Sequence, residues 1–213
     1  MYFCQDVDLL AWEPGAFLDA AFAHQAILKD AAGTLTGAAL SFGSATLDAV
    51  NAGMVAQAAL ADDSLTQLLE VVSITDAANA VVSALRGRST EPPIAALVGG
   101  SVKVTVVSFR PQIAAVGDEL LALVGVPADR DDADPSCADL TGFRLATIYG
   151  TLAAIYRTLA QASSATNITY SKLGFYEGLY RGARRAIAAT VDRDGDGVPE
   201  TRVHAGVATL RRA

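Results

Sequence analysis

Residues 140–191 read LTGFRLATIYGTLAAIYRTLAQASSATNITYSKLGFYEGLYRGARRAIAATV, and this stretch decides the predicted fold. Its first half carries apolar residues spaced alternately three and four apart, namely Leu145, Ile148, Leu152, Ile155 and Leu159. The second half repeats this spacing at Leu173, Tyr176, Tyr180, Ala183, Ile187 and Thr190. Such spacing is typical of a helix with one apolar seam. Residues 163–167 are polar and have the usual length of a link between helices, so the stretch predicts a helical hairpin.

Three glycines fall four residues apart in the second predicted helix, at Gly174, Gly178 and Gly182. A glycine inside a helix costs roughly 1 kcal/mol relative to alanine, so three of them require a compensating contact. Close approach of another helix would supply that contact. Two interpretations stay open: the hairpin packs on the protein's own core, or the glycines and tyrosines of this helix face a second subunit.

Charge is divided unevenly along the chain. Residues 1–140 carry 6 basic and 18 acidic side chains, a net charge of −12, and residues 141–213 carry 10 basic and 5 acidic ones, a net charge of +5. The two parts add to the −7 of the whole chain, and the division indicates that different surfaces meet different partners. The pI is near 4.7 and no basic run is interleaved with aromatic residues, which disfavours a dedicated DNA-binding protein.

The composition is that of a folded protein, because hydrophobic residues make up 52% of the chain. The first residues lack the basic and apolar regions of a signal peptide, and no apolar run approaches the roughly 20 residues of a membrane span, so no membrane association is expected.

Cys4 and Cys137 lie far apart in the sequence, so we expect two free thiols. His24 has no second ligand at metal spacing, so we expect a packing role.

Within residues 1–109, the spacing of apolar residues changes once, from a helical period to one near two residues. Residues 4–24 predict short helices broken at Pro14 and Gly15. Further on, the pattern approaches alternation, with candidate strands at 34–42, 54–60, 66–74, 80–85 and 102–109. Short strands at this spacing predict a small antiparallel barrel or sandwich, while the alanine-rich residues 52–69 are also compatible with a helix. Pro111 then opens a predicted helix that Gly125 closes.

Two segments are rich in aspartate. For residues 127–139 we expect a solvated loop rather than a metal site, with Asp139 capping the next helix. Further on, Asp192, Asp194, Asp196, Gly197 and Glu200 match positions 1, 3, 5, 6 and 9 of a calcium-binding loop. Position 12 is Val203, where an EF-hand needs a glutamate, so a full EF-hand is excluded. A looser calcium turn, or a metal-free turn between a helix and a strand, remains.

The tail alternates through Val203, Val207 and Leu210 and predicts a last strand, which we expect to pair with a neighbouring protein. Together the elements predict an α+β fold with three parts. Residues 1–24 and 110–191 are expected to form a helical bundle or hairpin domain, and residues 25–109 an inserted small antiparallel β-barrel. Residues 192–213 are expected to form an acidic turn and an extended C-terminal strand.

Four short stretches carry a resemblance to a known family: DVDLLAWEP at 6–14, SFRPQI at 108–113, YEGLYR at 176–181 and VDRDGDG at 191–197. A chain with these stretches and this order of elements resembles the head–tail connector proteins, also called adaptor or neck proteins, of tailed bacteriophages and prophage-like particles. The likeness covers residues 1–24 and 110–191, whereas the 85-residue insertion at 25–109 departs from the simplest, all-helical members.

The resemblance implies a virion structural protein that assembles in the host cytoplasm. It implies an oligomeric ring of about twelve copies below the portal, around the DNA channel. The C-terminal segment would reach into a neighbouring protein, and the partners would be the portal protein and a tail or second neck protein. No enzymatic activity is implied. The acidic first part of the chain would suit a channel lining that repels DNA.

The candidate functional residues are expected to form protein–protein contacts or to bind calcium rather than to catalyse a reaction. The predicted interface residues are Tyr176, Tyr180, Arg181, Arg184, Arg185, Val203, Val207 and Leu210, and the candidate calcium ligands are Asp192, Asp194, Asp196 and Glu200. No sequence motif of a serine hydrolase, a P-loop NTPase, a zinc protease or a dinucleotide-binding fold is present. Two alternatives stay open. One is a secreted calcium-dependent binding module, for which Asn167, Ile168 and Thr169 form a glycosylation sequon, and the other is a different virion component such as a tail-completion protein.

Overall fold

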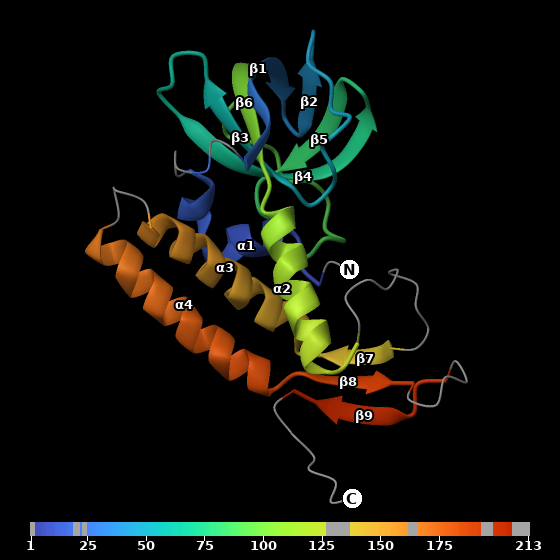
Figure 1. Cartoon of the computed structure of the whole chain (residues 1–213). Helices are drawn as coiled ribbons and strands as arrows, with labels where there is room; N and C mark the ends of the chain where they lie inside the picture. Colours follow the sequence, from blue (N-terminus) through green and yellow to red (C-terminus); the bar gives the residue numbers. More distant parts are fainter. Residues whose placement is uncertain are drawn as a thin grey trace, which may run out of the picture. The chain divides into compact units, whose positions relative to one another are not determined.

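The structure, a computed structural model, describes residues 3–18, 22, 25–126, 137–161, 166–192 and 198–205, and only the backbone of 137–139. The chain divides into two compact units, a barrel unit and a hairpin unit (Figure 1). The barrel unit is Gln5–Phe109, and the hairpin unit is Met1–Cys4 with Arg110–Ala213. None of the helices in the described part of the chain has the length and apolar content needed to span a bilayer.

The barrel unit is built on a closed barrel of six antiparallel strands. Around the barrel the order is β1 (Ala26–Thr36), β2 (Ala39–Phe42), β5 (Asn79–Ser83), β4 (Thr66–Asp76), β3 (Val55–Leu60) and β6 (Gly100–Val107). Alternate side chains point inward and fill the interior, and Leu35, Leu69, Val82 and Val104 are fully buried there. The helical alternative for residues 52–69 is wrong, because β3 and the start of β4 occupy this stretch and pair with each other.

The first helix, α1 (Asp6–Trp12), is anchored to the end of β6 by a buried carboxylate. The Ser108 hydroxyl and the Phe109 backbone N–H each donate a hydrogen bond of 2.7 Å to Asp6. The ring of Phe109 then packs edge-on against Phe17, in the short 3-10 helix η1 (Pro14–Phe17), and against Phe22. The predicted break at Pro14 is therefore confirmed, and the residues before the barrel pack onto its last strand.

A buried ion pair holds the loop after β5. Arg86 donates to both carboxylate oxygens of Glu70, at 3.1 and 2.6 Å, and to the carbonyl oxygens of Ser89 and Glu91, at 2.8 and 2.7 Å. The hydrogen bond to Glu70 raises the pKa of the Arg86 guanidinium, although burial opposes that shift. One charged side chain thus fixes a strand of the barrel and the turn that follows it.

In the described residues, the hairpin unit contains three helices and a small sheet (Figure 1). α3 (Phe143–Gln161) and α4 (Asn167–Arg185) lie side by side, and α2 (Arg110–Leu123) packs on α3. The strands β7 (Cys137–Thr141), β8 (Ala188–Val191) and β9 (Thr201–His204) form an antiparallel sheet in the order β7-β8-β9. Leu120, Phe143 and Ile187 are buried in the core between these elements. The helix expected between Pro111 and Gly125 is confirmed, and Gly125 adopts a φ of +80° just after its end.

The predicted fold class is wrong. The chain is not a helical bundle with an inserted barrel and a lone tail, because the unit that contains α2, α3 and α4 also contains a three-stranded sheet. Ile187 and Thr190 continue the helical spacing of the sequence, yet α4 ends at Arg185 and residues 188–191 form β8. Residues 186–191 are few and rich in alanine, so their apolar pattern is compatible with a buried strand as well as with a helix. Asp139 lies in β7, four residues before α3 begins at Phe143, so it does not occupy the N-cap position of that helix.

The expectation that the tail strand has no partner within the chain is also wrong for its first residues. β9 pairs with β8, with Ala188 opposite His204 and Val191 opposite Thr201. The Ala205 N–H donates a further hydrogen bond of 3.0 Å to the Ile187 carbonyl. Val207 and Leu210 lie outside the described residues.

Candidate functional site

α4 is the most exposed of the long helices, and its two faces differ sharply. Tyr176 is its one buried residue. Seven exposed residues, which we call the outward face of α4, share the opposite side of the helix at 100° per residue. They are Ile168, Ser171, Gly174, Phe175, Gly178, Gly182 and Arg185. The large apolar side chains among them are 69% exposed at Ile168 and 58% exposed at Phe175.

The three glycines of the outward face do not take part in the packing of the hairpin. A Cβ atom added at Gly174, Gly178 or Gly182 would meet no described atom within 4 Å. The contact that would compensate for their helical cost is therefore not found within the described chain. Of the two interpretations of the glycines, packing against the protein's own core does not account for them.

The inner face of α4 packs on α3 through aromatic rings. Tyr176 stacks on Tyr156 with 5.6 Å between ring centroids and 9° between ring planes. Lys172 donates a hydrogen bond of 3.1 Å to the Tyr156 hydroxyl and lies 5.4 Å from the centre of its ring. Tyr176, a predicted interface residue, is thus placed in the interior of the hairpin.

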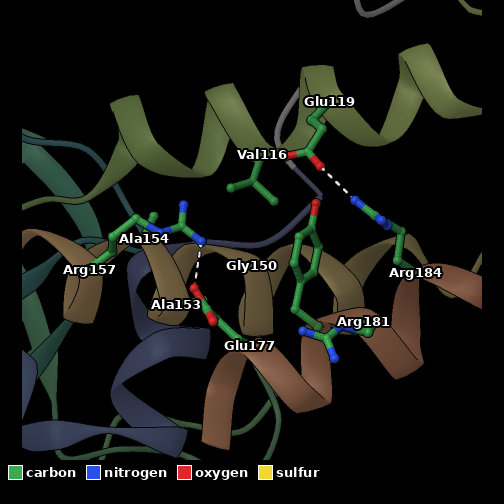
Figure 2. Close-up of a pocket in the computed structure, with 10 residues that line it drawn as sticks. Val116, Glu119, Gly150, Ala153, Ala154, Arg157, Glu177, Arg181 and Arg184 are labelled. Atoms are coloured by element: carbon green, nitrogen blue, oxygen red, sulfur yellow. Dashed lines mark hydrogen bonds and ion pairs between the residues drawn. The ribbon is translucent and has the colours of Figure 1, made fainter. Parts of the chain in front are cut away.

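A pocket of about 320 Å³ opens between α2, α3 and α4, and we call it the arginine pocket (Figure 2). It is lined by Val116, Glu119, Gly150, Ala153, Ala154, Arg157, Glu177, Tyr180, Arg181 and Arg184. Two ion pairs cross it: Arg157 with Glu177 at 2.9 Å, and Arg184 with Glu119 at 3.1 Å. Each joins α4 to another helix, and because the partners are half-exposed, each is expected to contribute at most about 1 kcal/mol.

Gly150 allows α2 and α4 to approach α3 beside this pocket. A Cβ atom at Gly150 would lie 2.6 Å from Val116 Cγ1 and 2.8 Å from Tyr180 Cε2. Real side chains do not approach so closely, so any larger residue here must displace both neighbours. Sequence reasoning noted the three glycines of α4 but missed this one, the glycine of α3 that contacts its neighbours.

The Tyr180 hydroxyl is buried and has no well-aligned hydrogen-bond partner among the described residues. Burial, and next the negative charge of Glu119, raise the pKa of this hydroxyl, whereas Arg184, 5.7 Å from the centre of the ring, opposes the shift. The hydroxyl therefore keeps its proton at neutral pH and can donate it in a hydrogen bond. The Glu119 carboxylate acts on this hydroxyl through its charge and a weak hydrogen bond, so the chain itself supplies an acceptor for the phenol proton.

Arg181 and Arg185 carry the unpaired positive charge of α4. Neither makes a hydrogen bond or ion pair to any residue that the structure describes. Arg181 lines the arginine pocket, whereas Arg185, one turn further along, lies on the outward face. The predicted interface arginines thus divide into one ion-paired residue, Arg184, and two exposed ones.

The remaining predicted site residues are only partly described. Val203, in β9, is half-buried against the core of the hairpin unit. Asp192 and Glu200 are described, but Asp194, Asp196 and His24 lie outside the described residues. Within the described part of the chain, no group of three or more histidine, cysteine, aspartate or glutamate residues could hold a metal ion. Calcium binding by the acidic turn therefore stays a prediction.

Comparison of the chain with models of known protein families, with characterised proteins and with solved structures found no match. The resemblance to connector proteins thus stays a prediction that rests on the sequence, and the site has to be interpreted from its own geometry.

Alanine substitutions should distinguish the two kinds of glycine. Gly150→Ala is expected to destabilise the protein by about 1–3 kcal/mol, because its Cβ overpacks the contact with Val116 and Tyr180. Gly178→Ala is the matched control and should stabilise the isolated chain by up to about 1 kcal/mol, because its Cβ enters open space. Urea unfolding of dilute, monomeric protein measures both. Equal effects of the two variants would contradict the assignment.

Proposed function

We propose that the protein is a structural, non-enzymatic subunit of the neck of a phage or phage-like particle. In this proposal, copies assemble into a ring that joins the portal and head to the tail around the DNA channel. The observation that supports it best is the outward face of α4, where Phe175 and Ile168 are exposed on the same side as three glycines that no described residue covers.

The outward face has the properties of a helix that packs against another protein. The three glycines together cost roughly 3 kcal/mol relative to alanine in an isolated helix. Small residues let a second helix approach the backbone closely. Burying the Phe175 side chain would contribute a further stabilisation of about 1.5–3 kcal/mol. A contact outside the described chain would therefore offset what the glycines cost.

The division of charge favours contacts between unlike surfaces. The outward face ends in Arg185, which is cationic and unpaired among the described residues, while residues 1–140 carry a net charge of −12. A heterologous contact between a basic surface of one copy and an acidic surface of the next can close into a ring. A ring with an overall negative charge would also let DNA pass without binding tightly, since like charges repel.

Native mass spectrometry of the full chain, with and without calcium, tests the proposal. We expect one closed assembly of about twelve copies, or such an assembly once the portal protein is added. A chain that stays monomeric at every concentration, gains one calcium ion and binds no virion protein would contradict the proposal. That result would instead favour the calcium-dependent binding module.

A further inference from the structure

The arginine pocket has a floor of small side chains and a rim of charged ones (Figure 2). Val116, Gly150 and Ala153 are buried at its base. The ion-paired side chains of Arg157 and Glu177 at its rim are 58% and 37% exposed, so the pocket opens to solvent. A pocket of this kind can enclose a bulky side chain that enters from another protein.

The size and the chemistry of the pocket suit an aromatic ring. Its volume is about 320 Å³, whereas a cavity of about 150 Å³ is enough to hold benzene. Arginines border it, and guanidinium groups are attracted to the face of an aromatic ring. Arg184 already lies 5.7 Å from the centre of the Tyr180 ring. A second ring that enters the pocket would make the same kind of contact.

Phe175 is the most exposed aromatic side chain in the described part of the chain, at 58%. Its ring packs edge-on against Tyr176, with 5.2 Å between the ring centroids, which restricts its orientation on the helix. Gly174 and Gly178 beside it carry no Cβ atom, so the ring protrudes from a smooth surface. Another protein can therefore approach the helix closely enough to enclose the whole ring.

Phe175 and the arginine pocket lie on opposite sides of α4. At about 100° per residue, Arg184 is half a turn around the helix from Phe175, and Glu177 and Tyr180 fall within about 40° of Arg184. A chain therefore cannot place Phe175 in its own pocket. Two copies related by a twofold axis cannot exchange these groups either, because each copy would have to present both sides of α4 to the other. A contact between the two features is head-to-tail.

We propose that the arginine pocket of one copy receives the Phe175 side chain of the next copy. The inference rests on the assembly of copies in the proposed function, and it names the surface that the outward face of α4 meets. The ring lies over the small side chains of the floor, and guanidinium groups of the rim pack against it. Head-to-tail contacts of this kind close into a ring when the rotation between neighbours allows it.

Two variants each remove one half of the contact. Phe175→Ala removes the inserted ring and keeps the pocket, whereas Ala154→Trp fills the pocket and keeps Phe175. Each variant alone is expected to raise the dissociation constant between copies by about tenfold or more, because the ring is no longer buried. Size-exclusion chromatography with light scattering, at the concentration where the wild type assembles, measures this loss.

Each variant has a matched control. Leu97→Ala removes another exposed apolar side chain, in the barrel unit, and Thr158→Trp adds the same large ring to α3 one turn beyond Ala154, outside the pocket lining. Both controls should assemble as the wild type does. Thermal melting of every variant checks that the chain is folded. Equal loss of assembly in the variants and their controls would contradict the inference.

Mixing Phe175→Ala with Ala154→Trp is the sharpest test. The Ala154→Trp chain supplies Phe175 and the Phe175→Ala chain supplies an open pocket, so one contact is complete and should give a heterodimer and nothing larger. A photoreactive phenylalanine analogue at position 175 of the Ala154→Trp chain should then crosslink to residues 150–154 of the Phe175→Ala chain. Mass spectrometry of the digested product locates the crosslink.

The outcomes separate this inference from the proposed function. If the wild type assembles, the inference is overturned when both variants assemble equally well, or when their mixture gives neither a heterodimer nor a crosslink to the pocket. The proposed assembly would stand in that case. If the wild type stays monomeric at every concentration, alone and with the portal protein, both the inference and the proposed function fail.

Discussion

Replacing Arg86 by methionine is expected to lower the free energy of unfolding of the barrel unit by about 3–5 kcal/mol. The reason is burial: the Arg86 and Glu70 side chains are only 5% and 8% exposed, so the variant leaves a buried carboxylate without its cation. The variant also removes the donors that hold the carbonyl oxygens of Ser89 and Glu91. Urea unfolding, followed by circular dichroism, measures the loss.

An exposed ion pair in the same barrel supplies the control. Lys103 and Asp63 lie 3.0 Å apart with side chains 43% and 68% exposed, so Lys103→Met should cost at most about 1 kcal/mol. A double variant with Glu70→Leu and Arg86→Met should recover much of the lost stability, since it leaves no unpaired buried charge. Similar losses for Arg86→Met and Lys103→Met would show that burial of the pair is not what matters.

Gly178→Arg is expected to abolish assembly while leaving the fold of each chain intact. A side chain at this position enters open space within the chain, so the monomer should melt as before or slightly higher. Between two closely packed helices there is no room for a guanidinium, and the contact should fail. Size-exclusion chromatography with light scattering measures the assembly.

The matched control for Gly178→Arg adds the same charge to the neighbouring helix. Thr158 is exposed on α3 and lies outside both the outward face of α4 and the arginine pocket. Thr158→Arg should therefore leave assembly unchanged. Loss of assembly in both variants, or in neither, would argue against α4 as the contact between copies.

The elements that the sequence predicted well are those in which one face is buried along several turns or residues. The alternate spacing of three and four residues from Leu145 to Leu159 predicted α3, which spans Phe143–Gln161. The high content of β-branched residues predicted the strand at 102–109, observed as β6 at Gly100–Val107. In both cases the information is local, carried by the spacing of apolar residues in α3 and by residue type in β6.

The small sheet could not be predicted in the same way. β7, β8 and β9 have only four or five residues each, and β7 pairs with β8 across some 50 positions of the sequence. A run such as Ala188 to Val191 is too short to show a period, and its conformation is decided by partners far along the chain. Tertiary pairing determined these strands, and the predicted fold class failed for that reason.

The candidate sites show the same division between local and non-local information. The sequence placed tyrosines and glycines on one helix but did not separate the inner Tyr176 from the outward Gly178. The arginine pocket depends on Val116, Gly150 and Tyr180 from three helices. No spacing along the chain indicates that these three residues lie close together. The one hint in the sequence is Gly150, a glycine inside a predicted helix, which suggests a close contact with a neighbouring element.

Site-specific photo-crosslinking at Phe175 tests most directly whether copies meet at the outward face of α4. We would place a photoreactive phenylalanine analogue at Phe175 and, as a control, at Leu97, which is 88% exposed in the barrel unit. We expect Phe175 to crosslink efficiently to a second copy of the chain, and Leu97 to crosslink weakly. An absence of crosslinks between copies at Phe175, in protein that assembles normally, would contradict the proposed contact.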